Sequence, residues 1–263
     1  MTNISVIILQ KNEVLHIKRC LEKLAPLEPR QIFVVDCFST DGSDKIAAEM
    51  GAQVVQHEWP GNQAVQFNWA LDNLKIESEW ILRIDADEWL TQELVEEIKA
   101  RLSSIDKEVD GVVLKRRHYF SGSWVKHGTY PTRILRLFRT GKARYDDRMV
   151  MDEHFVVAGK VVEFENDFVD ESLIPFSEWQ AKHRAYAKRE AQMAISGTAN
   201  ANKRKYYKLP PYFRAVLYFC IRYFVKLGFL DGRVGWRWHF WQGLWYRWIV
   251  DREIGRMKCG CSH

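Results

Sequence analysis

The chain has 263 residues, of which 47% are hydrophobic and 13% aromatic, so it can form a full-sized core and is not a disordered protein. Its formal net charge of +5 assigns no partner by itself. Five scattered cysteines fit a reducing cytoplasm better than a disulfide scaffold. The sequence also lacks the basic start of a signal peptide and any uncharged apolar run of about 18 residues, so no membrane-spanning helix is expected.

Strand and helix patterns alternate along the first part of the chain. A β-branched run at 4–9 is typical of a strand that is buried on both faces. Further strands are predicted at 31–36, 53–56 and 80–84, and helices at 14–24, 62–75, 91–104 and between the Asp41-Gly42 turn and Gly51. This alternation predicts a parallel, doubly wound α/β sheet, in which ligands bind beyond the carboxyl ends of the strands.

The rest of the chain is less regular. Strand-like segments between 110 and 170 predict antiparallel additions to the parallel sheet. Recurring alanines predict a helix at 177–195, and Pro210-Pro211 marks a boundary after a polar stretch at 200–208. The remainder is unusually rich in aromatic and basic residues.

Polar clusters follow three of the predicted strands. Asp85-Ala86-Asp87-Glu88 comes after the strand at 80–84, Asp36 ends the strand at 31–36, and Lys11-Asn12-Glu13 follows the first strand. Because the carboxyl ends of parallel strands meet at one edge of a sheet, these clusters are expected to converge. A D-x-D motif there can bind one Mg²⁺ or Mn²⁺ ion that holds a diphosphate. The alternative is that the acidic run caps the next helix, and Glu88 in particular fits a capping or supporting role.

Three segments, taken in order, resemble the family 2 glycosyltransferases, which have the GT-A fold. They read SVIILQKNE, VVDCFSTDGS and WILRIDADE, and the resemblance is dense over about residues 3–100. Further along, GNQAVQFNWAL, DDRMVMDEH and GFLDGRVGW are similar to segments of bacterial lipopolysaccharide-core and surface-polysaccharide β-glycosyltransferases. The resemblance implies a hexosyltransferase whose donor is a nucleotide sugar, with UDP as the nucleotide.

The resemblance also implies roles for single residues. Asp36 would read the uracil or ribose edge of the donor, although a turn or helix-capping role is the alternative for this carboxylate. Asp87 would bind the metal ion directly, and Asp85 would be shared between the metal and the ribose. Gln63 and Gln66 stand where many relatives carry a basic residue, which leaves the diphosphate contact open. The residues implied for nucleotide-sugar binding are Asn12, Glu13, Asp36, Ser39, Gln66, Asn68 and Asp85.

An inverting reaction needs a base beside the acceptor hydroxyl, on the face opposite the diphosphate. The resemblance points to the acidic pair Asp152 and Glu153, and alignment on Arg148 favours Asp152. His154 is a candidate to orient that carboxylate or to bind phosphate. The alternative is that this segment is an exposed turn between strands.

Two aromatic segments, at 212–227 and 236–249, carry basic residues. On the first, Arg214, Arg222 and Lys226 are expected to lie away from a broad apolar face. Basic helices rich in Trp and Tyr suit a membrane interface, whereas packing on the catalytic core or in a dimer is the alternative. Binding to nucleic acid is not expected, because the acidic clusters at the sheet edge would repel phosphate in the absence of a metal.

The sequence thus predicts an α/β protein with a nucleotide-sugar-binding half at 1–115, an acceptor-binding half at 116–175 and a helical region at 176–263 that contacts membrane. The predicted function is inverting, metal-dependent transfer of a sugar from a nucleotide donor to a lipid-linked saccharide in lipopolysaccharide or surface-polysaccharide biosynthesis. The enzyme would work at the cytoplasmic face of the inner membrane. A nucleotidyltransferase of the same fold and a non-catalytic glycan-binding or scaffold protein are the alternatives. The identity of the sugar, the acceptor hydroxyl and the oligomeric state are not predicted.

Overall fold

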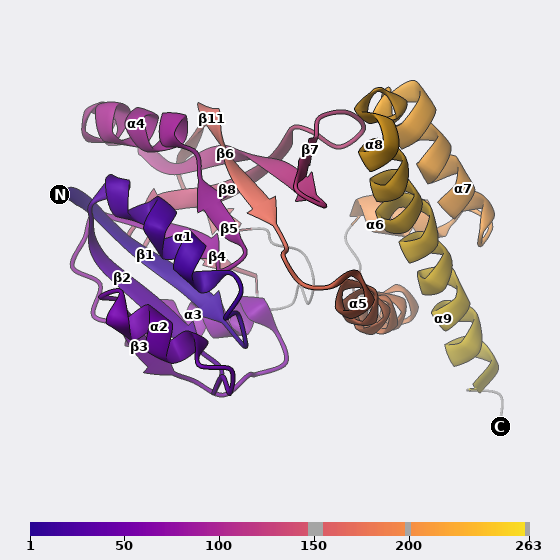
Figure 1. The fold of residues 1–263 in the computed structure, drawn as a ribbon, viewed down its shortest axis with the longest axis horizontal. Helices are drawn as coiled ribbons and strands as arrows, with labels where there is room; N and C mark the ends of the chain where they lie inside the picture. The colour runs from indigo at the N-terminus through magenta and orange to yellow at the C-terminus, as the bar shows by residue number, and fades with distance from the viewer. Residues whose placement is uncertain (147–154, 198–200, 261–263) are drawn as a thin grey trace. The chain divides into compact units, whose positions relative to one another are not determined.

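The computed structural model describes residues 1–146, 155–197 and 201–260, which form two compact units (Figure 1). Among these residues, the first unit consists of 1–117, 131–146 and 155–173. The second unit consists of 118–130 and the described residues from 174 onward.

The first unit is built on a sheet whose parallel part has the strand order β3, β2, β1, β4 (Figure 1). These strands are β1 (Thr2–Gln10), β2 (Pro29–Asp36), β3 (Gln53–Gln56) and β4 (Trp80–Asp85). The three pairings between them are all parallel, which confirms the predicted α/β sheet. The predicted strand limits differ from the observed ones by at most two residues at either end.

Strand β1 is buried on both faces, as its continuous apolar sequence predicts. Val6 and Ile8 belong to one hydrophobic cluster, and Ile7 and Leu9 belong to another. Because successive side chains of a strand point to opposite faces, the two clusters lie on opposite sides of the sheet.

Four helices also contribute side chains to these two clusters: α1 (Ile17–Leu24), α2 (Ser43–Glu49), α3 (Gln63–Asn73) and α4 (Gln92–Arg101). Helices α1, α2 and α4 contribute to the first cluster, and α3 contributes to the second. The side chains of Asn62 and Thr91 cap α3 and α4, accepting hydrogen bonds from Ala64 N at 2.8 Å and from Leu94 N at 3.2 Å. Gly51, with φ of +88°, follows α2 in the left-handed conformation that its sequence position predicts.

Beyond β4 the sheet continues with β8 (Thr132–Arg139), β6 (Val109–Phe120), β11 (Lys160–Glu171) and β5 (Glu88–Leu90). The β4–β8, β8–β6 and β11–β5 pairings are antiparallel, which confirms the expected additions. A separate two-stranded sheet pairs β9 (Ala143–Tyr145) with β10 (Phe155–Val157). Strand β5 was not expected, because three residues are too short for a period and its pairing partner lies far along the chain.

The second unit contains α5 (Phe176–Ser196), α6 (Ala201–Tyr207), α7 (Phe213–Cys220), α8 (Gly232–Trp238) and α9 (Tyr246–Gly260). Ala187 and Ala191 of α5, which are small enough for close helix packing, form a core with Tyr246 and Val250 of α9. Helix α6 occupies most of the stretch that the sequence indicated to be a polar connection. Its Lys and Arg residues are good helix formers, so polarity was misleading there.

Two π-helical segments continue the helices of this unit, at 221–225 after α7 and at 239–245 after α8. A smaller core near them combines Phe120, Trp179 and Trp238 with Val125 of β7 (Ser123–Val125), a strand that pairs with the end of β6. Of the helices that the structure describes, none combines the length and the hydropathy that crossing a bilayer requires.

The expectation that the basic side chains at 212–227 lie away from the buried face is wrong for two arginines. Arg214 and Arg222 are each only 3% exposed, whereas Phe213 and Phe224 are each 56% exposed. Arg214 is buried because it forms an ion pair with the buried Asp251 of α9. The pattern of hydropathy along one helix did not reveal this partner.

Candidate functional site

The register of the parallel strands brings Asp36 and Asp85 to the same edge of the sheet. Asp36 is opposite Gln10, and Asp85 is opposite Leu9, so the two carboxylates flank the end of β1. Asn12 and Glu13 follow β1 directly at this edge. The convergence of the three polar clusters that the sequence predicts is therefore confirmed.

The Asp36 carboxylate is fully buried and is held by three donors. Gln10 Nε2 lies 3.0 Å from Oδ1, Ser39 N lies 2.8 Å from Oδ2, and Ser39 Oγ lies 2.5 Å from Oδ1. These hydrogen bonds replace the water that the carboxylate loses on burial. Ser39, which the resemblance includes in the nucleotide site, thus fixes the orientation of Asp36.

The loops after β1 and β2 are tied together by side-chain to backbone hydrogen bonds. Asn12 N donates to Ser39 Oγ at 2.8 Å, Asn12 Oδ1 accepts from Thr40 N at 2.9 Å, and Asp41 Oδ2 accepts from Val14 N at 2.9 Å. Burial alone would raise the pKa of Asp41, but hydrogen bonds from Ser43 and Val14 bring that pKa below its usual range. The Asn12 amide therefore serves the loop that carries Asp36.

Glu13 is engaged with a buried histidine. Its Oε2 lies 2.6 Å from Nδ1 of His16, and Nε2 of His16 accepts a hydrogen bond from Leu173 N at 2.8 Å. Because Nε2 accepts, the ring carries its proton on Nδ1 and donates that proton to Glu13. Glu13 lies at the predicted edge, and its role in nucleotide binding stays a prediction.

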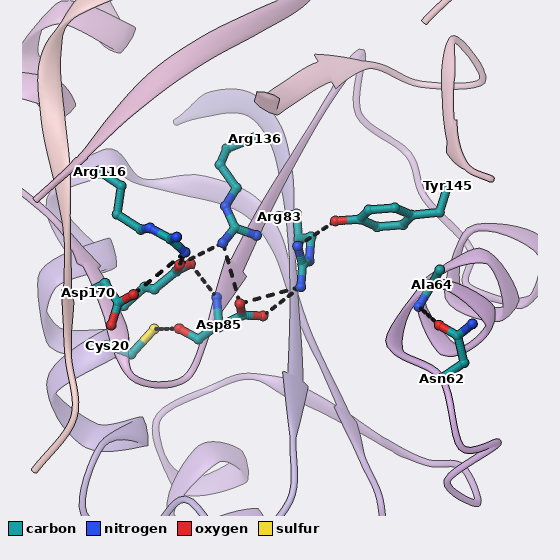
Figure 2. A network of polar contacts seen from close by, with 10 residues as sticks. Cys20, Asn62, Ala64, Arg83, Asp85, Arg116, Arg136, Tyr145 and Asp170 are labelled. Carbon is teal, nitrogen blue, oxygen red and sulfur yellow. Dashed lines mark hydrogen bonds and ion pairs between the residues drawn. The ribbon is translucent and has the colours of Figure 1, made fainter. Parts of the chain in front are cut away.

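Asp85 is flanked by two buried arginines, as Figure 2 shows. Nη2 of Arg83 lies 3.1 Å from Oδ1, and Nη2 of Arg136 lies 3.4 Å from Oδ2. Arg83 comes from the same strand, while Arg136 comes from the neighbouring β8. These guanidinium groups are the cations that make an acidic run at the end of a buried strand affordable.

Glu88 is a buried member of the same network and does not cap a helix. Its Oε1 lies 2.6 Å from Arg136 Nη2 and 3.8 Å from Arg116 Nη1, and its Oε2 accepts from Asp85 N at 2.9 Å. Arg116 also pairs with Asp170 at 3.6 Å (Figure 2). Burial raises the pKa of Glu88 well above its usual range, although Arg136 and Arg116 oppose that rise. The cap of the following helix is Thr91. Of the two roles expected for Glu88, capping and support, Glu88 therefore has the supporting one.

Gln66 and Asn68 on α3 are both buried, and both contact parts of the site's frame. Gln66 Nε2 lies 2.8 Å from Sγ of Cys37, the residue after Asp36. Asn68 forms two hydrogen bonds of 3.0 Å with the backbone of Tyr145, whose hydroxyl accepts from Arg83 (Figure 2). These contacts link α3 to Asp36 and Asp85, and direct contact of either residue with a donor stays a prediction.

Asp85 and Asp87 carry the type of oxygen ligand that a hard divalent cation prefers. Both offer carboxylate oxygens, and each side chain is partly exposed at the sheet edge. Two guanidinium groups fix Asp85 and leave it lone pairs, since a carboxylate has about four acceptor sites. Within the described ranges, no group of three or more His, Cys, Asp or Glu residues forms a complete metal cage. A cation at this edge would therefore complete its coordination with oxygens from a ligand or water.

The predicted base lies outside the described residues. Asp152, Glu153 and the neighbouring His154 all fall within 147–154. Their assignment as base and orienting residue stays a prediction from the sequence.

Arg83, Arg136, Arg116 and Tyr145 belong to this site and were not predicted for these roles. Arg83 could have been found, because a charged residue inside an apolar strand, two positions before Asp85, shares the face of that aspartate. Arg136 could not have been found in this way, because the local sequence does not show that β8 lies next to β4 in the sheet.

Comparison with known proteins gives the class of this one. The family model described as "Glycosyl transferase family 2" matches residues 5–163, more than half of the chain. The chain therefore belongs to the family 2 glycosyltransferases, as the resemblance of its motifs predicted.

Similar proteins are found among sequences and solved structures. The chain is 28% identical to the "Lipopolysaccharide core biosynthesis glycosyltransferase LpsC" of Rhizobium meliloti over 232 residues, which is 82% of this chain and 80% of LpsC. It is 36% identical to an "Uncharacterized glycosyltransferase" of Rickettsia felis over 108 residues, which is 41% of this chain and 37% of that protein. Its fold is similar to the crystal structure of S. aureus TarS 1-349 in complex with UDP, with a TM-score of 0.50 and 15% identity over 97% of this chain and 92% of TarS. The chain thus has the GT-A fold, with an additional helical, aromatic-rich region.

Proposed function

We propose that this glycosyltransferase is an inverting, metal-dependent hexosyltransferase that moves a sugar from a UDP-sugar to a lipid-linked saccharide of lipopolysaccharide or a surface polysaccharide. The observation that carries the proposal is the pair of carboxylates, Asp36 and Asp85, that flank the end of β1. In sheets of this kind, ligands bind beyond the carboxyl ends of the strands. The similarity to LpsC supports the pathway, and the UDP bound to the structurally similar TarS supports the donor.

In this proposal the donor lies across the end of β1. Asp36, oriented by Gln10 and Ser39, accepts hydrogen bonds from the base or the ribose. Asp87 and Asp85 hold a Mg²⁺ or Mn²⁺ ion, which when bound stabilises the charge that develops on the leaving diphosphate. Arg83 and Arg136 hold the Asp85 carboxylate in place for this purpose.

The acceptor side of the proposal rests on the sequence. Residues 1–115 would form the nucleotide-sugar-binding half, and residues 116–175 the acceptor-binding half. Asp152, or its neighbour Glu153, would take the proton of the acceptor hydroxyl as that oxygen attacks the anomeric carbon. Replacing Asp152 by Asn should abolish transfer and leave UDP binding intact, whereas the same result for Glu153→Gln would move the base by one residue.

The metal and nucleotide assignments can be tested together by thermal shift. UDP with Mn²⁺ should raise the Tm more than UDP alone and more than GDP, ADP or CDP with Mn²⁺. Asp87→Ala should remove the Mn²⁺-dependent part of the shift and most of the transferase activity, while the shift with UDP alone persists. If Asp87→Ala keeps full Mn²⁺-dependent binding and activity, the metal assignment is wrong. Release of pyrophosphate in place of UDP during turnover would instead indicate a nucleotidyltransferase.

We also propose that the second unit binds the cytoplasmic face of the inner membrane through the turn between α7 and α8. This apolar turn, residues 224–230, exposes five large hydrophobic side chains: Phe224, Val225, Leu227, Phe229 and Leu230. Lys226 and Arg233 are exposed within and beside it. Apolar side chains flanked by cations match the interface of an anionic bilayer.

The sequence around the apolar turn contains few acidic residues that would repel an anionic bilayer. Between Lys203 and Val250 the sequence contains ten Lys and Arg residues and one acidic residue, Asp231. The Asp231 side chain is only 5% exposed, and its Oδ1 lies 2.7 Å from Nδ1 of His127. The exposed charge of the turn is therefore positive, which favours anionic lipid over a neutral surface.

A further inference from the structure

Phe38 has a backbone conformation that its residue type disfavours. Its φ is +55°, in the left-handed region, where a Cβ atom crowds the following carbonyl oxygen. Asn12, which shares this conformation nearby, has a short polar side chain that hydrogen-bonds to Thr40 N. A phenyl ring offers no such compensation, so glycine would fit the Phe38 backbone better.

Burial of the Phe38 side chain does not offset this strain. It is 56% exposed, although its neighbours Asp36 and Cys37 are buried. In the part of the chain that the structure describes, the ring packs against no other aromatic ring and beneath no cation. The contacts of the Phe38 ring within the described residues therefore do not offset the strain of its backbone.

The surrounding loop holds Phe38 in this conformation from both sides. Phe38 N donates to Gln56 Oε1 at 3.1 Å, and the next residue, Ser39, donates its N–H to Asp36 at 2.8 Å. Ser39 Oγ also accepts from Asn12 N at 2.8 Å. Backbone strain that is fixed in this way by several contacts is concentrated at ligand-binding sites.

The location of the ring matches a planar ligand. Phe38 lies two residues after Asp36, at the edge of the sheet where a nucleotide is proposed to bind. Aromatic side chains stack on the faces of nucleobases, and they do so for every base because each has a π-face. Beside the buried Asp36, the exposed Phe38 offers an apolar surface for the face of a base.

We infer that Phe38 is a base-stacking residue of the donor site, which packs its ring against the base of the nucleoside diphosphate. This assignment rests on the proposed nucleotide-sugar function. It assigns the strain at Phe38 to ligand binding: the loop presents the ring to the ligand instead of to the core.

The test compares three variants at Phe38 for UDP binding by calorimetry with Mn²⁺ present. Phe38→Gly relieves the strain and removes the ring, Phe38→Leu keeps the strain and removes the ring, and Phe38→Tyr keeps both. UDP should bind the Gly and Leu variants about 5- to 100-fold more weakly than the unaltered protein, and the Tyr variant within about twofold. The Tm of Phe38→Gly should be unchanged or up to about 4 °C higher, because the left-handed strain is lost.

Inorganic pyrophosphate with Mn²⁺ is the matched probe without a base. Its affinity should be the same for all four proteins, because the ring is assigned to the base alone. The inference is overturned if the Leu or Gly variant binds UDP as tightly as the unaltered protein. It is also overturned if Phe38→Gly lowers the Tm, because the ring would then support the fold. If the unaltered protein binds no nucleoside diphosphate at all, the proposed function fails instead.

Discussion

Single side chains at the site are set by charge that comes from different strands. Glu88 is only 2% exposed, yet its carboxylate meets Arg136 at 2.6 Å and Arg116 at 3.8 Å. A buried carboxylate without a partner would be strongly destabilising, whereas a paired one is tolerated. The arginines of β6 and β8 are therefore needed for the acidic motif to be compatible with the fold.

Replacing Arg136 by Met should lower the free energy of unfolding by about 3–5 kcal/mol, because it leaves Glu88 buried without its nearest cation. The pKa of Glu88 is already raised by burial and should rise further in this variant. Urea denaturation of the purified protein measures the loss.

Arg133 on the same strand is the matched control. It is exposed and pairs with Glu163 on the surface at 2.8 Å, so Arg133→Met should cost at most about 1 kcal/mol. Adding Glu88→Gln to Arg136→Met should recover part of the loss, since the uncompensated charge is then removed. Equal, small losses for Arg136→Met and Arg133→Met would contradict the buried-pair account.

At the scale of single elements, the helices of the second unit depart from simple periodicity. The π-helical segments at 221–225 and 239–245 place Arg222 and His239 inside the unit. Gly128 and Gly228 approach the His239 ring so closely that a Cβ atom on either would lie 2.4 Å from it. Apolar positions alone do not reveal such turns, because each π turn shifts the sequence that follows it around the helix axis.

The buried His239 should make the second unit sensitive to mild acid. Burial and the nearby charge of Arg222 lower the pKa of His239 to about 4. The charge of Asp231 opposes this shift only in part. An unfolded histidine titrates near pH 6.5, so between these values the unfolded chain binds a proton that the folded chain does not. The stability from this group should be fully present above about pH 6.5 and lost as the pH falls toward 4.

Thermal denaturation at pH 7.5 and pH 5 measures this effect. His239→Gln, which cannot titrate, should show a smaller fall in Tm between the two values than the unaltered protein. The difference between the two proteins isolates His239 from the carboxylates, which titrate in both. An identical fall in both proteins would show that His239 does not titrate on unfolding in this range.

At the scale of the whole chain, charge and apolar exposure are unevenly distributed. The first unit carries the acidic edge, and the second carries the basic stretch with the apolar turn at 224–230. Removing the chain after Lys208 is not a clean test of membrane binding, because it would also uncover Ala187 and Ala191 of α5. Point changes at exposed positions avoid this problem.

The double variant Val225→Glu/Leu230→Glu should weaken binding to vesicles that contain phosphatidylglycerol by at least about tenfold, because two apolar side chains no longer enter the interface. Val156→Glu, which makes the same change at an exposed valine of β10, should bind like the unaltered protein. Vesicle sedimentation at two salt concentrations measures both, and binding should fall with salt. If the double variant binds as tightly as the unaltered protein, the apolar turn is not the membrane contact.

The sequence by itself determined the parallel half of the sheet, the helices between its strands and the edge at which Asp36 and Asp85 meet. These features follow from local patterns, since a strand buried on both faces and a capped helix are each encoded within about a dozen residues. Only the tertiary structure decided that Arg136 and Glu88 pair, that Arg214 is buried and that Phe38 is strained and exposed. Such contacts join segments that are far apart along the chain, and a local pattern carries no record of which segment will be the neighbour.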